Sequence, residues 1–136
     1  MSLHDEERKA IVKLELDKAE NTYEEIEILT NAHRWSGAAN RMYYAVFHAI
    51  NALLIYDGHH VNTHRGSHAV FSQFYIKTGI FPAKFSKLYS NLQTLREESD
   101  YNCIYNVTEQ EIADAIVPAR ELIDAIKEYI KKDCQQ

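Results

Sequence analysis

Apolar residues recur at helical spacing in five successive segments of the chain. In residues 5–32 they return at mostly helical spacing among Glu and Lys, which predicts an amphipathic, partly exposed helix. The apolar set is Ile11, Leu14, Ala19, Tyr23, Ile26, Ile28 and Leu29. Residues 36–56 form the most apolar stretch. We predict a second helix there, with Ser36 as its N-cap and Gly58 just beyond its end.

The second half of the chain predicts three further helices. Thr63 is the expected cap of a helix that runs to Lys77 and ends at Gly79, and Pro82 suits the first turn of the next one, which continues to Tyr101. Thr108 and Glu111 have the spacing of a capping box, which opens a last helix through Lys131. The predicted fold is therefore all-α: an up-and-down bundle of four main helices plus a shorter one.

Composition agrees with one helical domain over residues 1–136. The 136 residues include only four Gly and two Pro, which favours long helices and short loops. Cys103 and Cys134 are the two cysteines and show no metal-ligand spacing, so a reducing compartment is expected. Residues 1–18 are charged, and no apolar run is long enough to cross a bilayer, so we expect a cytoplasmic protein with no membrane contact.

The formal net charge of −5 argues against broad binding of nucleic acid. An acidic surface repels the phosphate backbone, so any RNA or nucleotide has to be bound at a small local site, or the partner is a basic protein. The acidic run Glu24, Glu25 and Glu27 is most simply explained as a solvated face of the first helix.

A polar stripe runs along the otherwise apolar second helix. At 100° per residue, one arc of about 100° contains Asn40, Arg41, Tyr44, His48 and Asn51. Arg41 and His48 are separated by six residues, and therefore by roughly 10 Å along the helix. A two-fold axis beside the stripe would bring two arginines and two histidines into one cleft.

Four strings between residues 40 and 102 resemble a known family. NRMYYAVFHAINALL (residues 40–54) resembles the helix of small stand-alone prokaryotic HEPN-domain proteins, whose motif is Arg, four to six residues, then His. LREESDYN (residues 95–102) is similar to a later segment of the same subfamily, and NTHRGSHAVF (62–71) followed by FYIKTG (74–79) resembles its intervening helix.

The resemblance implies a helical domain that forms a homodimer about the motif helix and, in many relatives, a metal-independent ribonuclease that acts as a toxin without a cofactor. The partner would be a minimal nucleotidyltransferase. In RNA the 2′-OH can attack the adjacent phosphate, so the protein has only to move protons and stabilise negative charge. His48 would act as general acid or base and Arg41 would hold the phosphate oxygens, while Asn40 and Tyr44 would orient substrate or imidazole.

Two other interpretations remain open. The chain could be a non-catalytic nucleotide-binding or partner-binding module that assists a nucleotidyltransferase. Alternatively, the stripe could be a polar layer of a structural protein, internally paired or at a dimer interface, with Asp100 or a glutamate as the partner of Arg41. Exposure of His48 in the cleft would separate the enzyme from the binding module. A monomeric chain with an internally paired stripe would favour the structural protein.

A second group of polar residues lies on the fourth predicted helix. Arg96 and Asp100 are four residues apart and can pair there. From the resemblance, Arg96, Asp100 and Tyr101 would pack against the motif helix and fix Arg41 or Tyr44.

Four histidines, His59, His60, His64 and His68, cluster between the second and third helices. Intervals of four could align three of them on one helix face. The cluster has no HExxH motif and no acidic residue, and Gly58 and Asn62 interrupt the helix. We therefore favour a solvated loop and helix start over a metal site.

Overall fold

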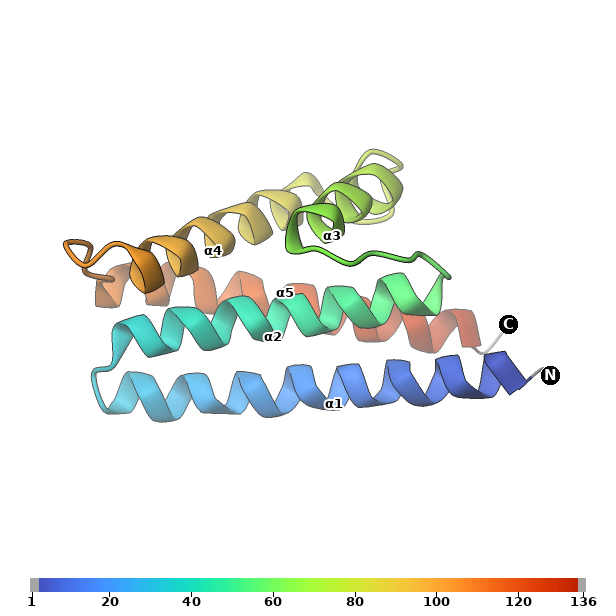
Figure 1. The fold of residues 1–136 in the computed structure, drawn as a ribbon, viewed down its shortest axis with the longest axis horizontal. Coiled ribbons are helices and arrows are strands. Elements are labelled where there is room, and N and C mark those ends of the chain that lie inside the picture. The colour runs from blue at the N-terminus through green and yellow to red at the C-terminus, as the bar shows by residue number, and fades with distance from the viewer. Residues whose placement is uncertain (1–2, 135–136) are drawn as a thin grey trace.

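The structure, a computed structural model, describes residues 3–134 and confirms the all-α bundle (Figure 1). Its elements are α1 (Leu3–Asn31), α2 (Trp35–Tyr56), α3 (His64–Phe71), the π-helical turn η1 (Ser72–Ile76), α4 (Ala83–Tyr101) and α5 (Glu109–Cys134). The predicted domain also included residues 1–2 and 135–136, which lie outside the described residues. Within residues 3–134, no helix combines the length and apolarity needed to cross a membrane.

The second helix is the centre of the bundle. It packs against α1, α3, α4 and α5, which explains why residues 36–56 are the most apolar part of the sequence. Many of its side chains are inaccessible to solvent, including Met42, Tyr43, Val46, Ile50 and Leu53. In Figure 1, α1 and α4 run in one direction, and α2 and α5 run in the other.

Local sequence signals set several of the helix ends. The Thr63 hydroxyl accepts from the Gly66 amide at 2.9 Å at the start of α3. Thr108 and Glu111 form the predicted capping box: the Glu111 amide donates to Thr108 Oγ1 at 3.2 Å, and the Thr108 amide donates to Glu111 Oε1 at 3.0 Å. Gly58 and Gly79 follow helices with φ of +81° and +83°, the left-handed conformation that glycine adopts without strain.

The predicted N-cap Ser36 is wrong. The second helix begins at Trp35, with Arg34 as N-cap and no side-chain capping bond. The cause is the tight end of α1, where His33 has φ of +58° and the Arg34 amide donates to the Leu29 carbonyl at 2.8 Å. This Schellman-type closure reverses the chain before Ser36 can act as a cap.

The third helix does not run as a regular α-helix to Lys77. It changes at Ser72 into a π-helical turn, closed by the Lys77 amide donating to the Ser72 carbonyl at 2.9 Å. The wider turn accompanies the burial of Tyr75, whose hydroxyl donates to Asp57 at 2.5 Å. Tyr129 on α5 donates to the same carboxylate oxygen at 2.8 Å, so the turn is tied to the C-terminal helix.

Candidate functional site

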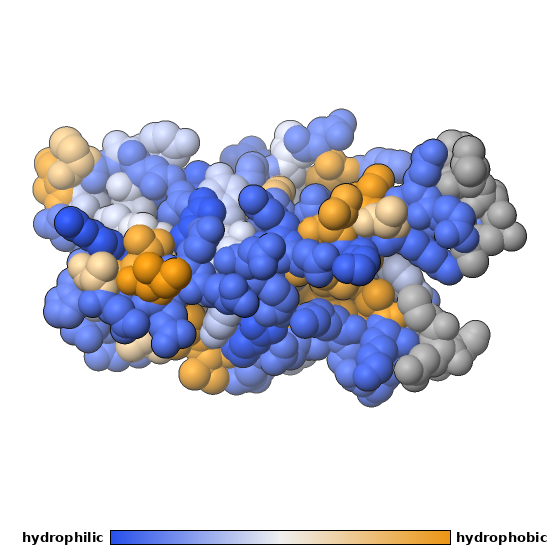
Figure 2. Space-filling model, turned by 90° about the horizontal axis from the view of Figure 1, so that it is seen from below, coloured by the Kyte–Doolittle hydropathy of each residue, from blue (hydrophilic) through white to orange (hydrophobic). Residues whose placement is uncertain are grey.

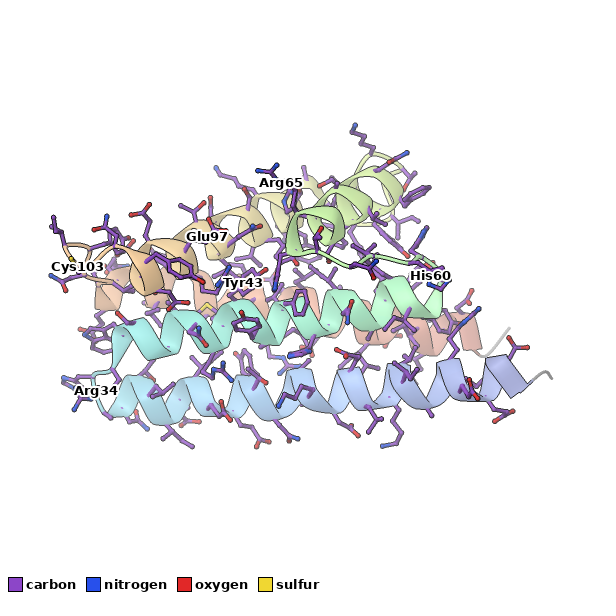
Figure 3. All side chains as sticks on the ribbon, viewed as in Figure 1. Arg34, Tyr43, His60, Arg65, Glu97 and Cys103 are labelled. Carbon is purple, nitrogen blue, oxygen red and sulfur yellow. The ribbon has the colours of Figure 1, made fainter. Side chains whose placement is uncertain are left out.

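One face of α2 stays partly exposed between its neighbours. Its partly buried residues are Asn40, Arg41, Tyr44, Phe47, His48 and Asn51. Acidic residues from α1 contact this face on one side, and residues of α3 and α4 contact it on the other. In Figure 3, Tyr43 and Glu97 mark the place where α2 and α4 face each other.

Arg41 is held by two acceptors. Its Nε and Nη2 donate to Asn40 Oδ1 at 3.1 and 2.6 Å, and its Nη1 lies 3.3 Å from Glu25 Oε2 on α1. The guanidinium also lies 5.6 Å from the centroid of the Tyr44 ring. With its side chain 31% exposed, Arg41 is both fixed in position and accessible from solvent.

The Asn40 side chain connects Arg41 to α4. Its Nδ2 donates to Asp100 Oδ2 at 3.4 Å, and the same oxygen lies 3.6 Å from Arg96 Nη1. Four side chains from two helices thus form one polar chain in the order Arg41, Asn40, Asp100, Arg96.

Arg96 is a buried cation beneath the stripe. Only 8% of the residue is exposed, and its guanidinium lies over the rings of Tyr43 and Tyr44, at 4.8 and 5.6 Å from their centroids. Its Nε is buried and has no hydrogen-bond partner in the described part of the chain. Tyr101, the last residue of α4, is 80% exposed, and its side chain interacts with Arg96 of the same helix.

His48 forms a separate pair with Glu15 of α1. Nδ1 of His48 lies 2.8 Å from Glu15 Oε2, and the two side chains are 20% and 23% exposed. Because a carboxylate can only accept, Nδ1 carries the proton of this hydrogen bond. In the neutral imidazole, Nε2 is therefore left as an acceptor.

Tyr44 separates the two networks. Its ring centroid lies 5.6 Å from the Arg41 guanidinium and 6.4 Å from the His48 ring. Within residues 3–134, no contact joins the arginine to the histidine directly, as their separation along the helix led us to expect. Asn51, one turn further along α2, takes no part in either network.

The histidines between the end of α2 and the end of α3 differ from one another in their contacts. Nδ1 of His64 lies 2.5 Å from the Tyr43 hydroxyl, and its ring stacks on Phe47 at 4.5 Å. Burial, followed by the charge of Arg96, lowers the pKa of His64. His59 packs on Phe74, and His68 contacts Tyr89 and the Ser86 carbonyl. Within residues 3–134, no group of three or more His, Cys, Asp or Glu is arranged to hold a metal ion.

Two residues at this site were not among our candidates. Glu15 and Glu25 contact the stripe from α1, but the sequence of that helix contains many similar glutamates. Only the packing of α1 on α2 distinguishes these two. The assembled site offers a fixed cation and an oriented imidazole, which could bind an anionic group and move a proton.

Comparison with known proteins gives a consistent family assignment. Residues 12–129 match the model of the HEPN domain. A UPF0332 protein of Thermotoga maritima is 29% identical over 125 residues, which are 92% of this chain and 95% of that protein.

Two relatives from Methanocaldococcus jannaschii carry more specific names. "Putative toxin MJ0605" is 27% identical over 93% of this chain and 91% of its own length. "Putative toxin MJ0142" is 24% identical over 85% of this chain and 78% of its own length. The similarity thus extends over nearly all of the helical bundle.

Proposed function

Because the chain belongs to the HEPN domain family, we propose that it is a toxin-like, metal-independent endoribonuclease that acts as a homodimer in the cytoplasm. The names of the two archaeal relatives support the toxin part of this proposal. A minimal nucleotidyltransferase is the proposed partner and antitoxin.

The observation that carries the proposal is the partial exposure of His48 and its hydrogen bond to a carboxylate. Its imidazole is partly exposed and bonded to a carboxylate at Nδ1; it is neither fully buried nor bonded to the backbone. Nε2 can therefore take the proton of a ribose 2′-OH as O2′ attacks the adjacent phosphorus. The bond from phosphorus to O5′ breaks, the leaving oxygen takes up a proton, and the products are a 2′,3′-cyclic phosphate and a free 5′-OH.

Arg41 is the proposed phosphate ligand. Its guanidinium is charged at any working pH and can donate two parallel hydrogen bonds to phosphate oxygens. Asn40 and Tyr44 hold it on the stripe, and Arg96 and Asp100 brace Asn40 and Tyr44 from α4. A second copy of the stripe across a two-fold axis would bring an arginine close to each histidine.

One observation favours a second candidate, a non-catalytic nucleotide-binding or partner-binding module. In this structure the Arg41 guanidinium is already bonded to Asn40 and Glu25. Binding of phosphate would have to displace Glu25, and the net charge of −5 opposes long RNA. A short nucleotide would meet less of that repulsion.

The test is cleavage of labelled single-stranded RNA by the purified protein in chelator, at equal dimer content for all variants. We expect His48→Ala to reduce the rate by roughly 100-fold or more, as is usual when a general acid or base is lost. Arg41→Ala should give a similar loss. His60→Ala, which removes an exposed histidine outside both networks, is the matched control and should cleave like wild type.

Absence of cleavage by the wild-type protein would contradict the nuclease proposal and favour the binding module. Equal activity of wild type and His48→Ala would show that His48 is not the general acid or base of the cleavage.

A further inference from the structure

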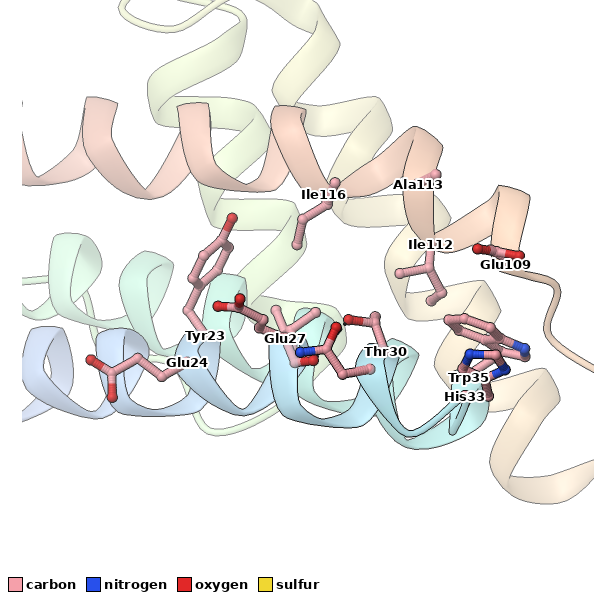
Figure 4. Close-up of a pocket in the computed structure, with 12 residues that line it drawn as sticks. Tyr23, Glu24, Glu27, Thr30, His33, Trp35, Glu109, Ile112, Ala113 and Ile116 are labelled. Atoms are coloured by element: carbon pink, nitrogen blue, oxygen red, sulfur yellow. Dashed lines mark hydrogen bonds between the residues drawn. The ribbon is translucent and has the colours of Figure 1, made fainter.

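A groove lies on α1 away from the α2 stripe, between the C-terminal half of α1 and the N-terminal half of α5 (Figure 4). Its volume is about 710 Å³, which is within the range of pockets that bind drug-sized ligands or peptide side chains. The lining residues come from Tyr23 to Asn31 of α1, from His33 and Trp35 at the turn, and from Glu109 to Ile116 of α5.

The groove exists because α1 packs chiefly on α2 and touches α5 over a short length. At one end, Glu20 of α1 binds Arg120 at 2.6 and 3.0 Å and Lys127 at 3.1 Å, and Arg120 lies over the ring of Tyr23. Beyond Tyr23 the facing side chains are smaller, with Thr30 on α1 and Ala113 on α5. The two helices therefore remain separated by an open channel.

The floor of this groove is apolar and its rim is acidic. Ile26 and Ile112 are buried, and Ile116, Tyr23 and Trp35 extend the apolar surface. Above them stand three exposed glutamates, Glu24, Glu27 and Glu109, and none of the described residues that line the groove is Lys or Arg. The run that we interpreted as a solvated face thus contributes Glu24 and Glu27 to this rim.

The three rim carboxylates have no ion-pair or side-chain hydrogen-bond partner within residues 3–134. Neighbouring glutamates of α1 differ in this respect, since Glu20 is bound by Arg120 and Lys127 and Glu25 is bound by Arg41. Three like charges around an apolar floor repel one another and favour an external cation.

We propose that this groove binds a segment of a partner protein that carries apolar side chains flanked by Lys or Arg. The apolar side chains would cover the isoleucine floor, and the cations would meet the three glutamates, as an amphipathic helix does in a hydrophobic groove. The inference does not depend on the proposed ribonuclease activity, because none of the groove residues belongs to the α2 stripe.

Apolar side chains outside the groove make a protein segment a better occupant than a small cation. Ile28 on α1 is 68% exposed and Val117 on α5 is 61% exposed. Each lies one helical turn after a groove residue, Ile28 after Glu24 and Val117 after Ala113, and therefore on nearly the same face of its helix. Figure 2 shows several separate apolar patches on a largely hydrophilic face. A polypeptide can cover both the groove and the exposed apolar side chains beside it, whereas a small ligand cannot.

Trp35, the sole tryptophan of the chain, lies in the groove and gives a direct readout. The experiment titrates the full-length protein with a synthetic amphipathic helical peptide of Leu and Lys while Trp35 emission is recorded. The control peptide has Glu in place of every Lys. We expect saturable binding of the Lys peptide that weakens as salt is added, and no binding of the Glu peptide.

Variants localise the binding. The triple change Glu24→Gln, Glu27→Gln and Glu109→Gln should weaken binding of the Lys peptide by about tenfold or more. A control triple with the same loss of charge, Asp17→Asn, Glu121→Gln and Glu128→Gln, changes exposed carboxylates outside the groove and should retain the affinity within about twofold. Ala113→Arg, at an exposed helix position, should block the groove while circular dichroism shows an intact fold.

The proposal is overturned by absence of peptide binding, or by equal loss in the two triple variants, which would indicate diffuse charge attraction. It is also overturned if spermidine competes as tightly as the peptide, since the site would then be one for a small cation. A change in Trp35 emission with protein concentration alone would assign the groove to a second copy of this chain.

Discussion

Glu15 on α1 accepts a hydrogen bond from His48 on α2, which comes 33 positions later in the chain. The sequence identifies Asn40, Arg41, Tyr44 and His48 because they share one helix and their angles can be calculated. It does not identify Glu15, because pairing across two helices depends on the register in which they pack. The sequence therefore predicts His48 but not the carboxylate that binds it.

We predict that Glu15 is a positioning residue for His48. Glu15→Ala should lower kcat for RNA cleavage by roughly tenfold or more and leave KM nearly unchanged, because the imidazole loses the partner that fixes its tautomer. Glu15→Asp should restore part of the rate. Asp17→Ala, at an exposed position of the same helix, is the control.

The measurement is steady-state cleavage kinetics with the thermal stability of each variant recorded in parallel. A loss of activity that follows the loss of stability, without rescue by Glu15→Asp, would indicate a structural role only.

At the scale of elements, helix ends were predictable where a side chain or a glycine determines them. Thr63, the Thr108 and Glu111 box, and the glycines at 58 and 79 all lie at the expected ends. The start of α2 was not predictable, because it follows from the left-handed His33, a conformation that is unusual for histidine. The π-helical turn also has no sequence signal of its own, since it depends on the burial of Tyr75 against Asp57.

The contact between α1 and α5 gives a prediction of pH dependence. Hydrogen bonds from Arg120, with a further one from Lys127, lower the pKa of Glu20 from 4.5 to about 2 against the opposing effect of partial burial. A carboxyl group with a lowered pKa in the folded state stabilises the protein above its unfolded pKa, and that stabilisation is lost as pH falls toward the folded pKa.

Glu20→Gln should therefore reduce the free energy of unfolding by about 1–2 kcal/mol at neutral pH, allowing for the partial solvent exposure of the pair. The difference from wild type should shrink as pH falls from 4.5 to about 2. Urea unfolding across this range measures it, and Asp17→Asn, in an exposed pair with Lys13, should show little difference. If wild type and Glu20→Gln kept the same difference in free energy of unfolding down to pH 2, the lowered pKa of Glu20 would be contradicted.

At the scale of the whole molecule, family and fold class were both accessible from the sequence. The strings around Arg41 and Arg96 indicated the HEPN family, which the domain match over residues 12–129 confirms. The groove between α1 and α5 was not accessible, because it results from how two helices remote in sequence diverge. Amphipathic patterns state which face of a helix is buried but not how closely two neighbours approach.

The proposed homodimer gives a further prediction. Ile11 and Leu14 are 46% and 67% exposed on α1, on the side that carries Glu15 and borders the α2 stripe. Leu14→Asp should shift the protein toward monomer in sedimentation and reduce RNA cleavage in parallel, because the proposed cleft is formed by two subunits. Ile104→Asp, which changes an 85% exposed residue in the α4–α5 loop, should leave both unchanged.

The measurement is sedimentation velocity over a range of protein concentrations. A monomeric wild-type protein would contradict the shared cleft, and so would a monomeric Leu14→Asp variant that retains full activity.

The short turn between α1 and α2 has a consequence for the order of folding. These two helices form the most extensive contact of the bundle and are adjacent in sequence, so the entropy lost in closing their loop is small. We expect this antiparallel hairpin to form first, on the ribosome, before α5 is synthesised. The nascent chain would then present Arg41 and the His48 and Glu15 pair on a preformed surface, on which α3, α4 and α5 subsequently assemble.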